Sequence, residues 1–521
     1  MLFRSSLAAY SYLGEMDTEN RAAGMFGRDV EARMAAESGV EYVAAQIALK
    51  QTDSTLDLYD DASIFSRQPI GGGGEARGQV RFSVLSPSMV GAFDSLPRAG
   101  LTTETARFNV NRLLELENDT DDTTDPYTAV SFIPNMSEDI CNAILDWIDS
   151  DEEARAGGAE SSTYEALAVP YSARNAPMQS IDELLQVQGV TPQLFYGEDA
   201  NRNGQLDPNE DDGGESAPAD DQDGALDFGL RDYLTVSSRE RNIQTTGEQK
   251  ININNGIVAE MFDALEESFD TETATFVTGY RLTGDQQADA QAQGKLTIEQ
   301  QQLVDWMAKN LANGELGKVT RGGMDLSNPP QASFRSMYDL IDAQVSVTVN
   351  GAAQTLNSPW SSTDPAGLME QMLLLEEKLT WLNDEFIDGR INVNIAPREV
   401  LLAIPDMTET IADAILGARP PAGENSVQAA QVMSLRRSPV WLLTEGLVDV
   451  PTFKRLGPWL TTTGDVYSFQ VLGHFDQGGP TTRLEAMVDG TKKPPRIVFQ
   501  RDLTGLGRGF APAVLDGVID E

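Results

Sequence analysis

One twelve-residue segment has the residue types and spacing of a calcium-binding loop. Residues 199–210 read Asp-Ala-Asn-Arg-Asn-Gly-Gln-Leu-Asp-Pro-Asn-Glu, which fits the EF-hand pattern at every specified position. Calcium takes carboxylate, amide and carbonyl oxygens as ligands, and the glycine at the sixth place allows a sharp turn. The expected ligands are Asp199, Asn201, Asn203, the Gln205 carbonyl, Asp207 and Glu210. The alternative interpretation is a solvated acidic turn whose spacing is coincidental.

Residues at the end of this loop and just after it favour a structural calcium site over a calcium-dependent switch. Pro208 and the pair Gly213-Gly214 disfavour the regular exit helix that a switching EF-hand would use. A second acidic stretch, with Asp221 and Asp223 ahead of a glycine, imitates the loop but has no glutamate at the twelfth place. It either forms a weaker second site or only solvates a loop.

The rest of the sequence offers little catalytic chemistry. Because Cys141 is the single cysteine, an intramolecular disulfide and a thiolate-rich metal cluster are excluded. Because His474 is the single histidine, any histidine triad or His-ligated zinc would depend on it alone. An enzyme would therefore need a carboxylate or lysine mechanism. The acidic candidates for such work, or for further metal ligands, are Asp146, Asp149, Asp151 and Glu160. A solvated helix end is the favoured interpretation of these four.

The charge balance argues against polyanionic partners. The chain has 521 residues, with 81 Asp and Glu against 38 Lys and Arg, which gives a formal net charge of −43. Binding to nucleic acid depends on cations that release counterions from phosphates. The hydrophobic fraction of 40% is ordinary for a globular protein, so the chain is expected to fold into two to four domains or one elongated body.

The first fifty residues predict one amphipathic helix. Its later part carries apolar residues at helical spacing, among them Ala36, Val40 and Val43. Its start, with Leu7, Tyr10 and Leu13, is apolar and is followed at once by charged residues, as in the end of a longer hydrophobic helix. Since a membrane span needs roughly 20 apolar residues, this start is expected to be the remnant of a membrane helix. We expect the six named residues to bind partner proteins.

Alternating patterns near both ends of the chain predict a small antiparallel sheet. Residues 80–85 alternate apolar and polar side chains, the same pattern returns at 467–471 and 484–488, and the run 496–500 follows as a further strand. The stretch between reads mostly as helices and loops. The predicted fold is α+β, an N-terminal helix on a small antiparallel sheet with a large, mainly α-helical insertion. The predicted parts are helix 1–50, first strands 51–111, insertion 112–463, last strands 464–501 and tail 502–521.

The predicted insertion contains internal repeats near 108–190, 251–346 and 391–456. Residues 133–145 recur with few changes as residues 404–416. An Asn-x-Asn turn precedes each repeat. Each unit is therefore expected to run from this turn through a helix, a tight turn and a second helix.

The tight turns resemble helix-hairpin-helix motifs. In versions that bind nucleic acid the hairpin is rich in glycine, so that backbone N–H groups can approach a phosphate. Here Asn135 and Asp406 put side chains, one of them anionic, at that place. Ser137 and Thr408 read equally well as helix N-caps. We therefore interpret the hairpins as structural.

Motifs along nearly the whole chain resemble the type II secretion system minor pseudopilin K family, also called general secretion pathway protein K. They occur in family order. The motifs are Arg33-Met-Ala-Ala-Glu-Ser-Gly39, Phe108-Asn-Val-Asn111, Ala143-Ile-Leu-Asp-Trp-Ile-Asp149, Gly157-Gly-Ala-Glu160, Pro170-Tyr-Ser-Ala-Arg-Asn-Ala-Pro177, Ser180-Ile-Asp-Glu-Leu184, Val187-Gln-Gly-Val-Thr-Pro192 and Asn392-Val-Asn-Ile-Ala-Pro397.

The resemblance implies a pilin-like scaffold and a non-enzymatic role at the tip of a periplasmic pseudopilus. The implied partners are minor pseudopilins I and J, the major pseudopilin, and the inner membrane through a missing N-terminal segment, with the bulk of the chain in the periplasm. The chain departs from the family in its extra repeat at about 251–346. Two other function classes stay open, a helix-hairpin-helix nucleic-acid-binding protein, which the charge disfavours, and a carboxylate-based hydrolase, which would need two acids across a cleft.

Overall fold

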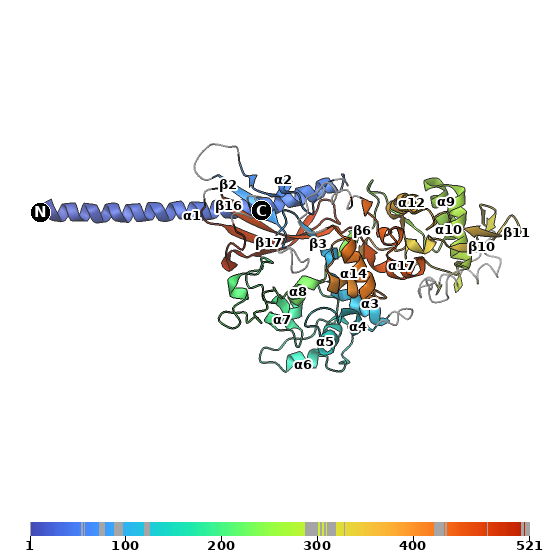
Figure 1. Cartoon of the computed structure of the whole chain (residues 1–521), viewed down its shortest axis with the longest axis horizontal. Coiled ribbons are helices and arrows are strands. Elements are labelled where there is room, and N and C mark those ends of the chain that lie inside the picture. The colour runs from blue at the N-terminus through green and yellow to red at the C-terminus, as the bar shows by residue number, and fades with distance from the viewer. Residues whose placement is uncertain are drawn as a thin grey trace. The chain divides into compact units, whose positions relative to one another are not determined.

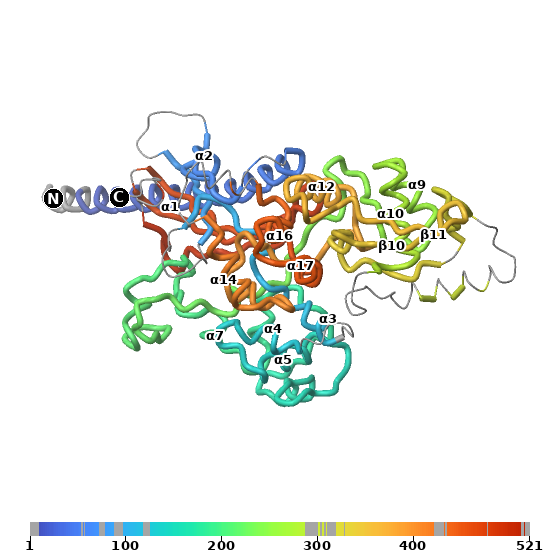
Figure 2. Tube along the Cα trace, turned by 45° about the vertical axis from the view of Figure 1, so that its right-hand side comes forward, coloured from blue at the N-terminus to red at the C-terminus, as the bar shows by residue number. Residues whose placement is uncertain are grey.

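The computed structural model describes the chain in two compact units. One comprises residues 1–104, 192–229 and 465–521, and the other residues 105–191 and 230–464. The structure describes residues 2–521 apart from 54–55, 57, 72–78, 88–96, 119–124, 287–300, 303–304, 307–308, 310–318, 328, 421–431, 433–434, 477, 512–514 and 516–521, and it leaves out the side chains of residues 2–9. Figures 1 and 2 show the path of the chain.

The first unit is a long helix packed on an antiparallel sheet. Helix α1 (Leu2–Lys50) precedes the short helix α2 (Ala62–Phe65). The strands are β1 (Gln68–Pro69), β2 (Val80–Leu85), β3 (Thr102–Thr103), β16 (Val466–Phe475), β17 (Thr482–Asp489) and β18 (Arg496–Asp502). Their order is β1-β2-β16-β17-β18, with β3 also paired to β16. The early strand β2 thus lies beside the late strand β16, as the alternating patterns at the two ends of the sequence predicted.

The C-terminal part of α1 forms the core of this unit with one face of the sheet. Ala36, Val40 and Val43 are buried against strand residues such as Phe82 and Val471. The helix approaches the sheet closely, because a Cβ on Gly473 would overlap the backbone oxygen of Ala32. The three helix residues were predicted at a partner surface, and this prediction is wrong because they fill the chain's own core.

The N-terminal part of α1 extends past the sheet (Figure 1). Tyr10 and Leu13 expose 81% and 65% of their surface. The side chain of Leu7, the third residue predicted at this end, lies outside the described residues. Within the described part of the chain, no helix is long and apolar enough to cross a membrane.

The second unit is mainly helical. Its helices are α3 (Leu113–Asn118), α4 (Pro126–Val130), α5 (Glu138–Ile148), α6 (Ser161–Glu165), α8 (Leu230–Tyr233), α9 (Val258–Ser268), α10 (Thr271–Thr283), α12 (Pro365–Lys378), α13 (Arg398–Leu402), α14 (Glu409–Ala418), α16 (Trp441–Thr444) and α17 (Val450–Leu456). Its described strands pair in twos. The pairs are β4 (Phe108–Asn109) with β5 (Leu234–Thr235), β6 (Arg239–Arg241) with β13 (Phe386–Asp388), β7 (Ile251–Asn252) with β12 (Leu379–Thr380), β8 (Thr320–Arg321) with β9 (Met324–Asp325), β10 (Gln344–Val349) with β11 (Ala352–Asn357), and β14 (Ile391–Asn392) with β15 (Leu460–Thr461).

The three Asn-x-Asn turns share one local structure. Each follows a two-residue strand that pairs in parallel, namely β4, β7 and β14. In each, the first asparagine accepts a hydrogen bond from the backbone N–H of the second, at 3.1 Å for Asn109, 2.7 Å for Asn252 and 3.0 Å for Asn392. This Asx turn explains the repeated asparagines, since a short amide side chain can close a turn on its own backbone. Part of the predicted middle repeat, residues 251–346, lies outside the described residues, mainly 287–300 and 310–318.

The tight turns of the first and last repeats also agree with each other. Asn135 and Asp406 have φ of 62° and 63°, a left-handed conformation that asparagine and aspartate tolerate better than most residues. Ser137 and Thr408 follow as N-caps of α5 and α14, and they accept from the backbone N–H of the residue three positions on. The interpretation of Ser137 and Thr408 as helix N-caps therefore agrees with the geometry.

The segment 192–229 belongs with the sheet. It was predicted inside the helical insertion, whereas its contacts place it in the first unit, with α1 and the C-terminal strands. The segment contains α7 (Pro192–Tyr196) and the predicted calcium loop. The insertion predicted as residues 112–463 is therefore interrupted by a piece of the sheet unit.

Candidate functional site

The predicted calcium loop folds as a tight turn around Asp199. Its carboxylate accepts hydrogen bonds from the backbone N–H groups of Asn203, at 3.0 Å, and Gly204, at 2.7 Å. Arg202 and Gly204 have φ of 60° and 70°, which turns the chain sharply at the glycine that the motif requires. The short 3₁₀ helix Pro208–Glu210 then ends the loop, in place of the long exit helix that the proline and glycines disfavoured.

Glu210, the last expected ligand, is completely buried. Its two carboxylate oxygens accept from the backbone N–H groups of Ala200, at 2.9 Å, and Asp207, at 3.0 Å. Burial raises the pKa of Glu210 to about 7; the neighbouring carboxylates of Asp199 and Asp207 also raise it, whereas backbone hydrogen bonds from Asp207 and Asn201 lower it. The loop thus concentrates negative charge in a place with little water, which favours a bound cation.

The two amide side chains of the loop converge on Asp207. The Nδ2 atoms of Asn201 and Asn203 lie 2.5 Å and 2.9 Å from Asp207 Oδ2. Asn201 Oδ1 is buried and finds no hydrogen-bond partner within the described ranges. Rotation of each amide would point its oxygen, instead of its nitrogen, toward Asp207, an arrangement that is stable only with a cation between them. The donor set therefore fits calcium.

The loop is fastened to the sheet of its own unit. Gln470 on β16 donates to the Arg202 carbonyl at 2.7 Å, and Asn203 donates to the Gly509 carbonyl at 2.6 Å. The Arg483 side chain on β17 donates to the Asn201 carbonyl. Sequence reasoning did not predict these contacts, because the partners lie more than 260 positions away.

The second acidic stretch does not form a comparable site. Asp221 and Asp223 are exposed, and each accepts from the backbone N–H two positions on, at 3.1 Å and 2.7 Å. Their carboxylates close local turns. The interpretation as loop solvation agrees better with this geometry than a second calcium site does.

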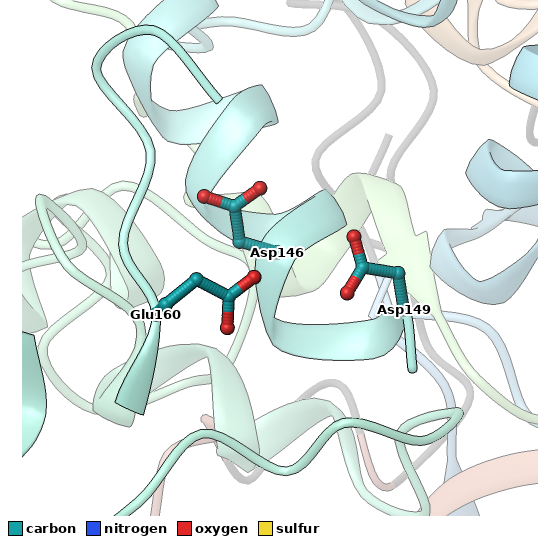
Figure 3. Close-up of side chains that lie close together, drawn as sticks. All are labelled: Asp146, Asp149 and Glu160. Atoms are coloured by element: carbon teal, nitrogen blue, oxygen red, sulfur yellow. The ribbon is translucent and has the colours of Figure 1, made fainter. Parts of the chain in front are cut away.

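A different set of acids converges in the second unit. Asp146, Asp149 and Glu160 are the one group of three or more such side chains, among the residues described, whose ligand atoms lie within 4.8 Å of one another (Figure 3). We call them the carboxylate cluster. Asp146 lies in the last turn of α5, Asp149 is its C-cap, and Glu160 is the N-cap of α6. A Cβ on Gly158 would overlap the Asp146 carboxylate, so a residue without a side chain lets the returning chain pass.

One cation of the chain itself serves two members of the cluster. Arg155 Nη1 lies 2.6 Å from Asp146 Oδ1 and 2.5 Å from Asp149 Oδ2. The same guanidinium also binds Glu117, with Nη2 at 2.7 Å. Arg155 therefore shares one positive charge among three carboxylates, and Glu160 receives no ion pair from it.

Glu160 is the unusual member. It is 2% exposed, and neither carboxylate oxygen has a hydrogen-bond partner in the part of the chain that the structure describes. Burial, and then the charges of Asp146 and Asp149, raise its pKa to about 7. The sequence interpretation of these acids as a solvated helix end is wrong, because Asp146 and Glu160 are buried. Asp151 alone is exposed.

The exposed part of α1 offers a third candidate surface. Besides Tyr10 and Leu13, large apolar side chains are exposed at Tyr12, Met16, Met25, Phe26, Val30 and Met34. Sequence reasoning missed Met25, Phe26, Val30 and Met34, because partner residues were predicted only at the start of the helix and in the stripe around Val40. The adjacent large apolar residues Met25 and Phe26, between Gly24 and Gly27, were the available signal.

Comparisons with known proteins converge on one family. Residues 106–196 match the family model for the type II secretion system, protein K. The type II secretion system protein K of Pectobacterium carotovorum subsp. carotovorum is 37% identical over 98 residues, which cover 17% of this chain and 30% of that protein. The match therefore spans less than a third of that relative's length.

A solved chain from the GspK-GspI-GspJ complex of the enterotoxigenic Escherichia coli type 2 secretion system covers 91% of this chain and 98% of its own length, at 10% identity and a TM-score of 0.34. A TM-score this low does not establish a shared fold. The family match rests on the segment that runs from the first Asn-x-Asn turn through the carboxylate cluster to α7. Residues 106–196 of this chain are therefore similar to the type II secretion system protein K family, the family that the sequence motifs resemble.

Proposed function

We propose that this protein is a minor pseudopilin that caps the tip of a periplasmic pseudopilus together with minor pseudopilins I and J. In that position it supports protein export across the outer membrane, with its bulk in the periplasm, attached to the inner membrane and placed on top of the major pseudopilin. The role is structural and needs no catalysis. The family match over residues 106–196 supports the assignment.

The observation that carries the proposal is the exposed apolar surface of α1. Tyr10, Met25 and Phe26 each expose at least 70% of their surface, on a helix that the unit's own sheet covers only from about Ala32 onward. Large exposed apolar side chains gathered on one element usually mark a partner site. Helices of the same kind on two further pseudopilins would cover them by helix-to-helix packing.

A calcium ion in the loop 199–210 would serve this role by stiffening the sheet unit. The loop contacts β16, β17 and the C-terminal segment through Gln470, Arg483 and Gly509. Calcium bound there would hold these contacts in place, because it replaces mutual repulsion of buried carboxylates with shared coordination. We propose it as a structural ion.

Nucleic acid fits the chain poorly. The net charge is −43, and Asp406, at the place where a phosphate would sit, forms an ion pair with Arg455 at 2.9 Å. A carboxylate hydrolase is also disfavoured, because two of the three converging acids are already paired with Arg155. The structural role remains the function that the residues support best.

The test is assembly with purified minor pseudopilins I and J, measured by size-exclusion chromatography with light scattering. We expect a heterocomplex at micromolar concentration. Leu13→Glu or Tyr10→Glu should abolish it without loss of the fold, since a charge buried in a helix seam costs several kcal/mol and a factor of ten in affinity corresponds to about 1.4 kcal/mol.

Val169→Glu is the matched control. Val169 is 80% exposed in the second unit, so the same change in charge and apolar surface is made away from α1, and assembly should persist. The proposal is wrong if all three proteins remain monomeric at tens of micromolar, or if the Leu13 variant assembles as well as the Val169 variant.

A further inference from the structure

Strand β11 is a sheet edge that the second unit leaves uncovered. It pairs with β10 on one side, and the backbone of residues 352–357 forms no hydrogen bond to described residues other than those of β10. All of its side chains are exposed except that of Leu356, which is half-buried. The outer side of β10 is better covered, because its Gln344 carbonyl accepts a hydrogen bond from the Gln286 N–H at 2.8 Å. The open edge of this hairpin is therefore β11.

The turn of the hairpin determines which backbone groups of β11 point outward. Asn350 and Gly351 have φ of 52° and 80°, as in a two-residue turn of type I′. Such a turn makes its two flanking residues a hydrogen-bonded pair, and bonded and non-bonded pairs then alternate along the ladder. The N–H and C=O groups of Ala353, Thr355 and Asn357 therefore point away from β10.

The sheet edges of the first unit carry protection that β11 lacks. Strand β1 is very short and contains Pro69. Strand β18 follows the pair Pro494-Pro495, begins at Arg496, and has an irregular register opposite Val488. Short length, proline, positive charge and bulges are the features that keep a sheet edge from pairing with another chain. Strand β11 reads Ala-Ala-Gln-Thr-Leu-Asn, is six residues long, pairs regularly and has none of these features.

The absence of charge at this edge favours a second copy of the chain as its partner. Residues 343–363 contain no Asp, Glu, Lys or Arg, although 23% of the chain is charged and its net charge is −43. Two copies repel each other over most of their surface, and the repulsion is smallest where neither carries charge. An uncharged edge matches an identical edge, whereas a charged strand of another protein would meet no opposite charge that selects it.

We propose that two copies of this chain pair through β11 and join their hairpins into one antiparallel sheet. A two-fold axis at Thr355 places this residue opposite its counterpart and Ala353 opposite Asn357 of the second copy. All outward-facing groups then meet outward-facing groups, which adds about six backbone hydrogen bonds. A pair of threonines directly opposite each other is also favourable. The inference does not depend on the proposed role at the pseudopilus tip.

The helix that covers the hairpin leaves room for the joined sheet. Val345 and Val347 of β10 are buried, and they lie against α10, because a Cβ on Gly279 would overlap the Val347 side chain. Neighbouring strands lie about 4.8 Å apart, so the two β10 strands would be separated by about 14 Å. Packed helices need only about 8–10 Å between their axes. One α10 from each copy therefore fits beneath the joined sheet.

Sedimentation equilibrium of the full chain tests the pairing. The joined edges are short, so we expect a weak dimer, with a dissociation constant of about 100 µM or below. Raising sodium chloride from about 0.05 M to 0.5 M should lower this constant at least threefold, because salt screens the repulsion between two chains of net charge −43. An interface built on ion pairs would respond in the opposite direction.

Thr355→Pro should weaken the dimer at least tenfold. Proline removes an N–H that points outward, so no hydrogen bond to β10 is lost. Thr355→Val is the matched control, because it keeps the backbone N–H, the size and the strand preference of threonine, and it should change the dissociation constant less than threefold. Leu13→Glu should also change it less than threefold, which separates this dimer from association through the exposed part of α1.

Cysteine crosslinking locates the axis even if Thr355→Pro fails to fold. A short bis-maleimide should link two copies of Thr355→Cys, but not two copies of Thr348→Cys on β10, which would lie farther apart. The chain's own Cys141 is buried, so it should not react. The proposal is overturned if the parent is monomeric at about 500 µM in high salt, if Leu13→Glu abolishes the dimer, if Thr355→Pro and Thr355→Val dimerise alike, or if Thr355→Cys gives no crosslink where the parent dimerises.

Discussion

The loop 199–210 and the carboxylate cluster gather similar ligands in opposite ways. In the loop, every expected oxygen lies within twelve consecutive residues, and each carboxylate already accepts hydrogen bonds inside the loop. In the cluster, two acids lie at the end of α5 and the third at the start of α6, and one carboxylate accepts no hydrogen bond from the described residues. The loop can therefore exist without an ion at moderate cost, whereas the cluster leaves an unsatisfied charge.

The difference distinguishes two properties of a metal site: the spacing of its ligands in the sequence, and the presence of buried polar atoms that lack partners until an ion binds. Spacing is a property of the sequence and identifies places where an ion fits. Which polar atoms the fold leaves without partners can be determined only once the burial of each residue is known. By this criterion the pattern at 199–210 is the clearer motif, and the cluster around Glu160 has the stronger need for a cation.

The largest effect is expected from removing both sites at once. Thermal unfolding with calcium or with chelator should show stabilisation of roughly 3 to 4 kcal/mol per site at a hundred- to thousandfold excess over the dissociation constant. Each single variant, Glu210→Gln or Glu160→Gln, should retain the calcium stabilisation that comes from the other site. The double variant Glu160→Gln/Glu210→Gln should retain none.

A sodium chloride series matched in ionic strength is the control, because a chain of net charge −43 gains from screening by any cation. If the double variant responds to calcium like the parent, neither place is a calcium site. If only one of the two single variants loses its stabilisation by calcium, the site changed in that variant is the one that binds calcium.

The sequence predicted the parts of the fold that depend on local periodicity. The apolar stripe around Val40 and the alternation around Phe82 and Val471 fixed the helix and the strands, because burial of one face requires these periods. The turn at Gly204 and the caps at Ser137 and Thr408 could be predicted too, because each depends only on residues close to it in the sequence. The remaining errors concern pairings between distant residues.

The cluster shows why such pairings were missed. Asp146 and Asp149 are three positions apart, so their proximity could be expected on a helix. Glu160 reaches them only because the chain returns past Gly158, and Arg155 neutralises two carboxylates rather than pointing to solvent. The sequence alone does not show whether a series of acidic residues is exposed to solvent or buried. Buried carboxylates favour a bound cation, whereas exposed ones are stable in water without one.

An intermediate effect is expected from the glycine that lets the chain return. In Gly158→Ala the new Cβ would overlap the Asp146 carboxylate, so the segment before Glu160 must shift. We expect a loss of about 2 kcal/mol in the free energy of unfolding, measured in urea, which is typical of overpacking. The cation affinity of the cluster should fall with it.

Gly214→Ala provides the comparison within the other acidic region. A Cβ there would meet nothing within 4 Å, so stability should change by less than about 0.5 kcal/mol. Equal effects of the two substitutions would mean that the close approach at Gly158 does not constrain the cluster.

The smallest effect concerns a buried titratable group that is satisfied, in contrast to Glu160. His474 on β16 is 3% exposed, and its Nε2 lies 3.1 Å from Ser83 Oγ. Burial lowers its pKa to about 4, assisted by the positive charges of Arg508, Arg67 and Arg81 and opposed by Asp476. The folded state therefore holds this histidine neutral well below its ordinary pKa of about 6.5.

The sign of the resulting pH dependence follows from this depressed pKa. Between about pH 6.5 and pH 4 the unfolded chain binds a proton at His474 that the folded chain does not, so stability is fully present above pH 6.5 and is lost as the pH falls. The loss at pH 6 should be about 1 kcal/mol, and His474→Gln, which can still hydrogen-bond Ser83, should remove that slope. Urea unfolding in chelator between pH 5 and pH 8 measures it. If the free energy of unfolding depends on pH in the same way in the variant, His474 titrates as freely in the folded chain as in the unfolded one. Burial alone would then be a poor guide to which groups in this protein require a partner.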